Sequence, residues 1–317
     1  MRRQHLHIIA NPQAGSGNAL KTIDLIESLL KNKQISYTTY LTQYPSHEKE
    51  IAQELLTTTL IPWDKAIEVF PLLLVVGGDG TLHEVTNRLA SFPRIPIAYI
   101  AAGSGNDFAR GLALTKKVTE ALDNILSLDE PSSIPLIATS FKEQGAPSIV
   151  LNNIGIGIDA HVVATANQSA SKSWLNKMKL GSLSYLKAAF KVLAHQGGFP
   201  ISFETPLVKE QFDNAYLCTI TNHPYFGGGI AIDPTAELKK EEMSLVIVEK
   251  INLFLIIYLI IRLLLKKHLT SKYVHQFTSQ EFILRSTQSE YCQTDGEVVG
   301  NQPQEIHCKM THRLFWV

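Results

Sequence analysis

Short apolar runs alternate with longer amphipathic segments along the first 134 residues of the chain. Residues 19–30 repeat apolar side chains at helical spacing, whereas residues 72–76 are apolar throughout, as in a buried parallel strand. The same pattern predicts strands at residues 6–10, 36–41, 72–76 and 97–100, and helices at residues 19–30, 47–56 and 82–90. This alternation predicts a parallel sheet covered by helices.

From residue 135 the pattern changes to short β-rich segments separated by turn residues, at 148–153, 215–221, 244–248 and 281–285. Such segments predict an antiparallel β domain. Helical stretches at residues 182–193 and 251–265 interrupt it. A chain of 317 residues is long enough for two cores, so we expect an α/β domain over residues 1–134 and a β domain over residues 135–306.

Glycine-containing segments directly follow three of the predicted strands, at residues 11–18, 77–81 and 101–107. Parallel strands end at one edge of a sheet, where open α/β folds bind ligands, so we expect the segments to converge. Backbone N–H groups at helix starts hold phosphates, although the first segment alone is equally an ordinary turn. Neither the Gly-x-x-x-x-Gly-Lys-Ser/Thr loop nor the dinucleotide fingerprint is present, so another kind of phosphate site is predicted.

Asp79 is the single carboxylate among the three glycines of residues 77–81, and Asp107 ends the third segment. A carboxylate beside phosphates can bind Mg²⁺ or accept a proton. The alternative for Asp79 is a tight turn that caps the following helix, although one glycine would suffice for such a turn.

The net charge of zero argues against nucleic acid as a partner. Three widely spaced cysteines without a Cys-x-x-Cys pair predict neither a disulfide framework nor a zinc site, and favour a reducing, cytoplasmic setting. After Arg2 and Arg3, only residues 5–10 precede Asn11 and Pro12, too few for a signal-peptide core, so an intracellular protein is expected.

Longer motifs carry a resemblance to a known family. Residues 77–85 read GGDGTLHEV, residues 103–110 read GSGNDFAR and residues 295–297 read DGE. Asn11-Pro12, GIGIDA at residues 155–160 and GGG at 227–229 support them. With these motifs in this order, the chain resembles the diacylglycerol kinase catalytic-domain family, which includes bacterial lipid kinases, sphingosine kinases and ceramide kinases.

The resemblance implies a two-domain fold like that of NAD kinases, with ATP held between an α/β domain and a β-sandwich. It also implies that residues 307–317 complete the first domain. The ATP-binding positions that it carries over are Asn11, Pro12, Gln13, Ala14, Gly15, Thr42, Gly77, Gly78, Asp79, Gly80, Thr81, Leu82, His83, Glu84 and Ser104. The family usually has Thr at the position of Ser104, and the hydroxyl is kept.

By the same resemblance, Asp295 and Glu297 are catalytic, with Glu297 as the base that takes the proton of a lipid hydroxyl. Asp79 and Asp107 are then expected to organise catalytic Mg²⁺. In some relatives the aspartate of the first domain is itself the base, so the choice among Asp79, Asp295 and Glu297 stays open. Taken alone, without the resemblance, Asp295-Gly296 favours a hairpin turn.

Many bacterial relatives carry an accessory Mg²⁺ site in which an Asp-Gly pair follows an alanine by four residues. Here Ala236 is followed at that spacing by Lys240 and Glu241. Either the Lys240 ammonium replaces the metal, or Glu241 and Glu242 bind it in a shifted register. A third reading is a degenerate kinase.

Two segments bear on membrane contact. The apolar run at residues 251–265 is too short to span a bilayer comfortably, and Lys266 and Lys267 follow it. Residues 171–191 place five lysines among apolar residues. Either segment can contact an anionic membrane, and the apolar run is equally a core helix or the interface of a homodimer.

The function expected from the resemblance is an ATP-dependent, Mg²⁺-assisted lipid kinase that converts diacylglycerol to phosphatidic acid. Such an enzyme is expected in the cytoplasm, peripherally associated with the inner face of the membrane. The alternatives are an NAD kinase-like enzyme and a non-catalytic lipid-binding or regulatory relative. The intact Asp79, Asp107, Asp295 and Glu297 argue against the non-catalytic reading.

Overall fold

The computed structural model describes residues 3–317, apart from residue 143 and the segments 169–192 and 194–195. The chain forms two compact units, the first comprising residues 1–136 and 311–317 and the second residues 137–310. Each unit has its own hydrophobic core. The predicted helix at residues 182–193, except for Leu193, and the lysine-rich segment at residues 171–191 lie outside the described residues.

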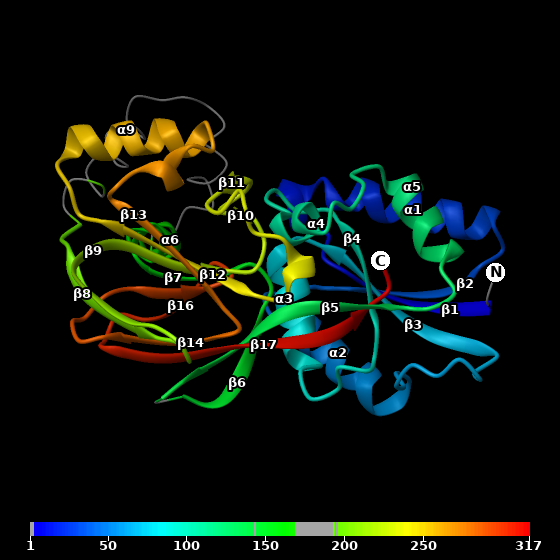
Figure 1. The fold of residues 1–317 in the computed structure, drawn as a ribbon. Coiled ribbons are helices and arrows are strands. Elements are labelled where there is room, and N and C mark those ends of the chain that lie inside the picture. The colour runs from blue at the N-terminus through cyan, green and yellow to red at the C-terminus, as the bar shows by residue number, and fades with distance from the viewer. Residues whose placement is uncertain (1–2, 143, 169–192, 194–195) are drawn as a thin grey trace. The chain divides into compact units, whose positions relative to one another are not determined.

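The first unit contains a parallel sheet in the order β4-β3-β1-β2 (Figure 1). Its strands are β1 (Arg3–Ala10), β2 (Ser36–Leu41), β3 (Val69–Gly77) and β4 (Ile97–Ala101). The central strand β3 pairs in parallel with β1 and with β4, and its residues 72–76 are fully buried. An uninterrupted apolar run is typical of a strand covered on both faces.

Helices cover both faces of this sheet (Figure 1). On one face, α1 (Ala19–Asn32) and α5 (Val118–Ser127) pack their apolar side chains against the strands. On the other face lie α2 (His47–Thr58) and α3 (Asp79–Arg88). The predicted helix at 82–90 thus begins earlier, at Asp79, because a carboxylate is favourable in the first turn of a helix.

The C-terminal residues 311–317 belong to the first unit and continue β17 (Gln304–Phe315). The buried guanidinium of Arg313 donates to the backbone oxygens of Leu89 at 2.7 Å and Ile95 at 3.0 Å. Trp316 is fully buried, and its indole N–H donates to the backbone oxygen of Ile125 at 2.9 Å. These bonds attach the end of the chain to three other segments of the unit.

The second unit is an antiparallel β domain built around a large hydrophobic core, with smaller apolar clusters beside it. Its main strand order is β16-β15-β7-β9-β8-β14-β17; β12 lies between β9 and β13, and β5 pairs with β6 and β17. The strands are β5 (Ser132–Phe141), β6 (Gln144–Val150), β7 (Asn153–Gly157), β8 (Phe199–Glu204), β9 (Lys209–Thr221), β12 (Met243–Glu249), β13 (Val274–Ser279), β14 (Glu281–Ser286), β15 (Cys292–Thr294) and β16 (Glu297–Gly300). A separate pair is formed by β10 (Tyr225–Phe226) and β11 (Ile230–Ala231).

Within the described part of this unit, the strands are accompanied by the helices α6 (Ile158–Gln168) and α9 (Leu253–Leu264) and by the 3₁₀ turns η2 (Leu238–Lys240) and η3 (His268–Thr270). The apolar run predicted as a helix forms α9, which begins after Asn252, whose side-chain oxygen accepts the Leu255 N–H at 3.0 Å. Such a cap satisfies a backbone donor that the first turn leaves unpaired. Among the described helices, none combines the length and the hydropathy needed to cross a membrane.

Candidate functional site

The three glycine segments of the first unit pack backbone against backbone. A Cβ atom added to Gly103 would lie 2.4 Å from the Cα of Gly78, and one added to Gly15 would lie 2.5 Å from the carbonyl oxygen of Ala102. Gly15 also has a φ of +58°, which favours glycine. The segments after β1, β3 and β4 therefore converge as expected, and glycine is required at these contacts.

Side-chain bonds fix the first segment against the second. The Asn11 amide donates to the Thr81 hydroxyl at 3.1 Å, and its oxygen accepts the Gln13 N–H at 3.0 Å. The residues that follow form the 3₁₀ turn η1 (Ala14–Gly17). Asn11, Gln13 and Thr81, predicted as ATP-binding residues, are thus part of one hydrogen-bonded edge of the sheet.

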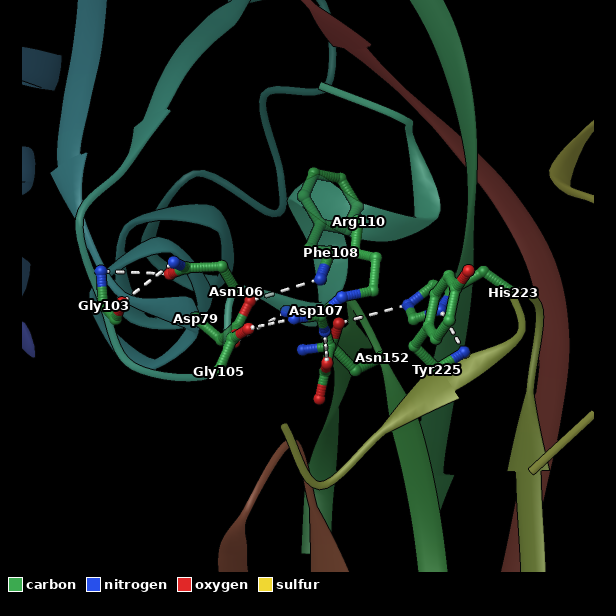
Figure 2. A network of polar contacts seen from close by, with 10 residues as sticks. All are labelled: Asp79, Gly103, Gly105, Asn106, Asp107, Phe108, Arg110, Asn152, His223 and Tyr225. Atoms are coloured by element: carbon green, nitrogen blue, oxygen red, sulfur yellow. Dashed lines mark hydrogen bonds and ion pairs between the residues drawn. The ribbon is translucent and has the colours of Figure 1, made fainter. Parts of the chain in front are cut away.

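Asp79 stands at the start of α3 and bonds to the start of α4 (Asp107–Gly111) (Figure 2). Its two carboxylate oxygens accept the backbone N–H groups of Asp107 at 3.0 Å and Phe108 at 3.2 Å. Those groups belong to the first turn of α4, which leaves its backbone donors without helical partners. Asp79 therefore caps α4, a neighbour across the site.

Asp107 is buried and forms an ion pair with Arg110 (Figure 2). The Arg110 guanidinium also donates to the Gly105 backbone oxygen at 3.0 Å. Asn106 adopts φ +55° and exchanges two hydrogen bonds with Gly103, which closes the third segment. The Arg110 cation competes with any metal ion for the carboxylate of Asp107.

The other predicted ATP-binding residues differ in exposure. Glu84 is buried and its carboxylate lies 2.7 Å from the ammonium of Lys49. His83 is also buried, in the middle of α3, and its backbone oxygen accepts the Asn87 amide at 3.1 Å. Thr42 is buried at the end of β2, whereas Ser104 is exposed. The Ser104 hydroxyl is thus open to a ligand at the edge of the sheet.

Asp295, in the second unit, accepts hydrogen bonds from three consecutive backbone N–H groups. Its carboxylate lies 2.8 Å from the nitrogens of Leu151 and Asn152 and 3.2 Å from that of Asn153. The Asp295 N–H in turn donates to the Asn153 oxygen at 3.0 Å. These bonds fasten the Asp-Gly-Glu motif to the start of β7.

The motif itself forms the turn between β15 and β16. Asp295 and Gly296 both have positive φ, of +50° and +86°, as a two-residue hairpin turn requires. Glu297 is the first residue of β16 and is exposed. Asp295-Gly296 therefore forms the hairpin turn that its local sequence favours. The turn is anchored through Asp295, and it exposes the side chain of Glu297 to solvent.

Asp159 received no role in the sequence interpretation, although it belongs to the GIGIDA motif. Its Oδ1 atom is buried, and burial raises the pKa of the carboxyl to about 7. A Cβ on Gly155 would lie 1.7 Å from the Asp159 Oδ2 atom, so the glycine makes room for this side chain. The Gly-x-Gly-x-Asp spacing was the available signal for it.

A second buried polar group joins two loops of the same unit (Figure 2). The imidazole Nε2 of His223 lies 3.1 Å from the Asn152 side-chain oxygen, and its Nδ1 accepts the Tyr225 N–H at 3.2 Å. Nε2 is therefore the protonated nitrogen. Asn152 also donates its N–H to Asp295, so His223 supports the loop that holds Asp295. No sequence pattern pointed to His223.

The predicted accessory metal site contains no recognisable ligand set. Lys240 lies 3.3 Å from the Glu237 carboxylate, and Glu241, which ends η2, is exposed. Throughout the part of the chain that the structure describes, no three His, Cys, Asp or Glu side chains gather as metal ligands. A site with so few protein ligands can hold Mg²⁺ only where phosphate oxygens and water complete the coordination of the metal.

An apolar cavity of about 110 Å³ lies beneath α9 in the second unit. Its walls are aliphatic and aromatic side chains of α9, β9, β12 and neighbouring segments, among them Ile256, Leu259, Ile260 and Leu263 of α9. The polar exception is His268, whose Nε2 bonds to the Ile232 backbone oxygen at 2.7 Å. Its buried Nδ1 has no partner among the described residues. The cavity thus offers hydrocarbon contact alone.

Comparison with known proteins identifies both units. The diacylglycerol kinase catalytic domain model matches residues 5–135, and the model of the YegS C-terminal NAD kinase beta sandwich-like domain matches residues 152–312. A Bacillus subtilis protein named "Putative lipid kinase YtlR" is 27% identical over 94% of this chain and 95% of its own length. The diacylglycerol kinase of the same organism is 25% identical over 94% of this chain and 91% of its own length.

Solved structures agree on the fold. The crystal structure of "a putative diacylglycerol kinase from Bacillus anthracis str. Sterne" superimposes with a TM-score of 0.73, at 21% identity, over 99% of this chain and 96% of that one. Yeast NADH kinase superimposes with a TM-score of 0.54 at 9% identity, over 99% and 84% of the two chains. The predicted two-domain fold, a parallel-sheet domain followed by a β-sandwich, is confirmed. The chain belongs to the diacylglycerol kinase catalytic-domain family of lipid kinases.

Proposed function

We propose that this protein transfers the γ-phosphate of ATP to the hydroxyl of a membrane lipid, with diacylglycerol as the acceptor and phosphatidic acid as the product. Family membership gives the reaction class, a lipid kinase. The single observation that carries the choice of a lipid is the apolar cavity beneath α9.

The converging glycine segments of the first unit are the proposed ATP site. The glycine segments approach one another closely at Gly15, Gly78 and Gly103, where a side chain would collide with the neighbouring backbone. Backbone N–H groups of the segments can therefore surround phosphate oxygens at short range. The start of α3 adds the positive end of a helix dipole to the same edge. The exposed hydroxyl of Ser104 and the amide of Asn11 are suited to hydrogen-bond the nucleotide.

Phosphoryl transfer needs alignment, neutralisation of charge and removal of one proton. Glu297 is the proposed base, because its carboxylate is exposed on a turn that Asp295 holds rigidly through three backbone bonds. Asp295 itself is the proposed positioning residue, since its three backbone bonds fasten the turn that carries Glu297. Asp79 orients α4 and is the proposed protein ligand of Mg²⁺, which when bound neutralises charge on the transferring phosphoryl group.

The cavity beneath α9 is the proposed site for hydrocarbon of the acceptor. An apolar cavity of roughly 150 Å³ accommodates benzene, so about 110 Å³ holds a short stretch of acyl chain. Each methylene removed from water contributes about 0.8 kcal/mol. The polar, charged substrate of an NAD kinase would gain little from such walls.

The test is transfer of labelled γ-phosphate from ATP and Mg²⁺ to diacylglycerol, sphingosine, ceramide and NAD in mixed detergent micelles. The native chain is compared with Glu297→Gln and with the matched control Glu281→Gln, which alters an exposed glutamate at the start of β14. We expect labelled phosphatidic acid from the native chain and the control, and a loss of at least 100-fold in Glu297→Gln. Label in NAD alone, or in no acceptor, would overturn the proposal.

A further inference from the structure

Helix α9 exposes large apolar side chains along one side. Phe254 is 86% exposed and Leu264 69%, and Tyr258, Ile261 and Leu265 lie on the same side of the helix or at its end, each at least half or nearly half exposed. Their spacing of three and four residues places them on one face. We call these five residues the outer face of α9. A surface helix normally carries polar residues there, so this face is suited to an apolar surrounding.

The cations around the outer face have no carboxylates near them in sequence. Lys266 and Lys267 follow α9 directly and are exposed, as is Lys272, and Arg262 lies in the last turn of the helix. From residue 251 to residue 280 the chain contains no aspartate or glutamate. The Arg262 guanidinium bonds to the Tyr258 hydroxyl at 2.9 Å, which keeps this cation beside the outer face.

We propose that the outer face of α9 docks on the surface of an anionic lipid membrane. Apolar side chains bordered by lysines are the combination that binds at the boundary between headgroups and acyl chains. Anionic headgroups supply the negative charge that this part of the chain lacks. In a symmetric contact between two copies, the same stretch of the second copy would bring four more cations and no carboxylate, which leaves these charges unbalanced.

The inner face of the same helix strengthens the assignment. Ile256 and Leu259 are buried, and with Ile260 and Leu263 they line the apolar cavity. The hydrocarbon of a membrane at the outer face and the interior of the cavity are thus separated by the width of one helix. The inference rests on the proposed function in one respect, that the acceptor is drawn from the membrane.

The test is flotation of the full chain with vesicles in the absence of ATP. Vesicles of phosphatidylcholine with 30% phosphatidylglycerol are compared with vesicles of pure phosphatidylcholine, at low and high salt. We expect binding to the anionic vesicles that weakens in high salt. The double variants Phe254→Ser/Leu264→Ser and Lys266→Gln/Lys267→Gln should each bind at least tenfold more weakly.

Matched controls alter equally exposed residues elsewhere. Leu207→Ser changes a leucine that is 94% exposed in the β8–β9 turn, and Lys116→Gln/Lys117→Gln removes an exposed lysine pair before α5. Both should bind vesicles like the native chain. The proposal fails if the native chain does not float with anionic vesicles, or if the α9 variants float as it does. It also fails if Phe254→Ser/Leu264→Ser converts a dimer to a monomer and leaves vesicle binding intact.

A second assay separates docking from catalysis. A short-chain diacylglycerol below its micelle concentration reaches the enzyme without a membrane, so the α9 variants should phosphorylate it at the native rate. A native chain that floats with anionic vesicles but phosphorylates no lipid contradicts the proposed function and leaves docking supported. A chain that phosphorylates the short-chain lipid but does not float contradicts docking alone.

Discussion

The side-chain amide of Gln293 donates to the Oδ2 atom of Asp159 at 3.3 Å and so joins the Asp-Gly-Glu turn to a carboxyl whose Oδ1 atom is buried. The oxygen of the same amide accepts the Gly296 N–H at 2.7 Å. One glutamine therefore contacts the turn that carries Glu297 and a carboxyl whose pKa burial raises to about 7. The protonation of Asp159 and the geometry of the turn are linked through this amide.

The first prediction concerns the pH dependence of stability in Asp159→Asn. The folded pKa of Asp159, about 7, lies above the unfolded value of 3.8, so its contribution to stability is fully present below about pH 4 and is lost as the pH rises through 7. Relative to the variant, the native free energy of unfolding should fall by roughly 1.4 kcal/mol per pH unit between these values. Urea unfolding at pH 5, 6, 7 and 8 measures it.

The control for this prediction is Asp213→Asn, which changes an exposed aspartate of β9 in the same unit. Its unfolding free energy should follow that of the native chain at every pH. Parallel profiles for the native chain and Asp159→Asn would show that the buried carboxyl does not titrate in this range.

The second prediction concerns the contact between Gly78 and Gly103. Gly103→Ala places a methyl group 2.4 Å from the Gly78 Cα, so the segments must separate, at an expected cost of about 1–3 kcal/mol. The affinity of Gly103→Ala for ATP should also fall, because the separated segments form the proposed ATP site. In Gly80→Ala the added Cβ meets no atom within 4 Å, and the residue is helical, so stability should be unchanged or slightly higher. Thermal unfolding of both variants checks this, and equal losses would contradict it.

The third prediction separates the two acidic residues of the Asp-Gly-Glu turn. Asp295→Asn weakens three charge-assisted backbone bonds and should lower the free energy of unfolding by about 1–3 kcal/mol. Glu297→Gln should leave it within about 0.5 kcal/mol of the native value, because the side chain is exposed. Chemical denaturation measures both. A large loss of stability in Glu297→Gln would indicate a structural rather than catalytic role.

The fourth prediction concerns the cavity beneath α9. Ile260→Trp fills space that the proposed acyl chain occupies, so the KM for a long-chain diacylglycerol should rise at least tenfold while the KM for ATP stays unchanged. Leu207→Trp enlarges a side chain that is 94% exposed, away from both the cavity and the outer face of α9, and serves as the control. Unaltered kinetics in Ile260→Trp would place the acyl chain elsewhere.

Local sequence patterns were sufficient for much of the first unit. The predicted strand at residues 36–41 has the same bounds as β2, and the apolar run at residues 72–76 lies fully buried inside β3. These features depend on the spacing of apolar residues along one segment, which the sequence states directly. The convergence of the glycine segments could also be predicted, because parallel topology brings strand ends to one edge.

Other features depend on residues that meet only in the folded chain. The start of α3 at Asp79 follows from the local helix geometry, but the bonds from its carboxylate to α4 join residues 28 and 29 positions apart. The sequence predicted that Asp79 lies at the edge of the sheet, but it did not predict which groups bond to the Asp79 carboxylate.

The sequence by itself determined the two-domain order, the parallel sheet, the glycine segments and the Asp-Gly-Glu turn, because each is encoded in a short continuous stretch. Only the tertiary structure decided that Asp159 is buried beside Gln293, that His223 bonds to Asn152 across 71 positions, and that α9 separates an apolar cavity from an exposed apolar face. The physical reason is that burial sets a pKa, a hydrogen-bond partner or a cavity wall, and burial is a property of which distant segments pack together.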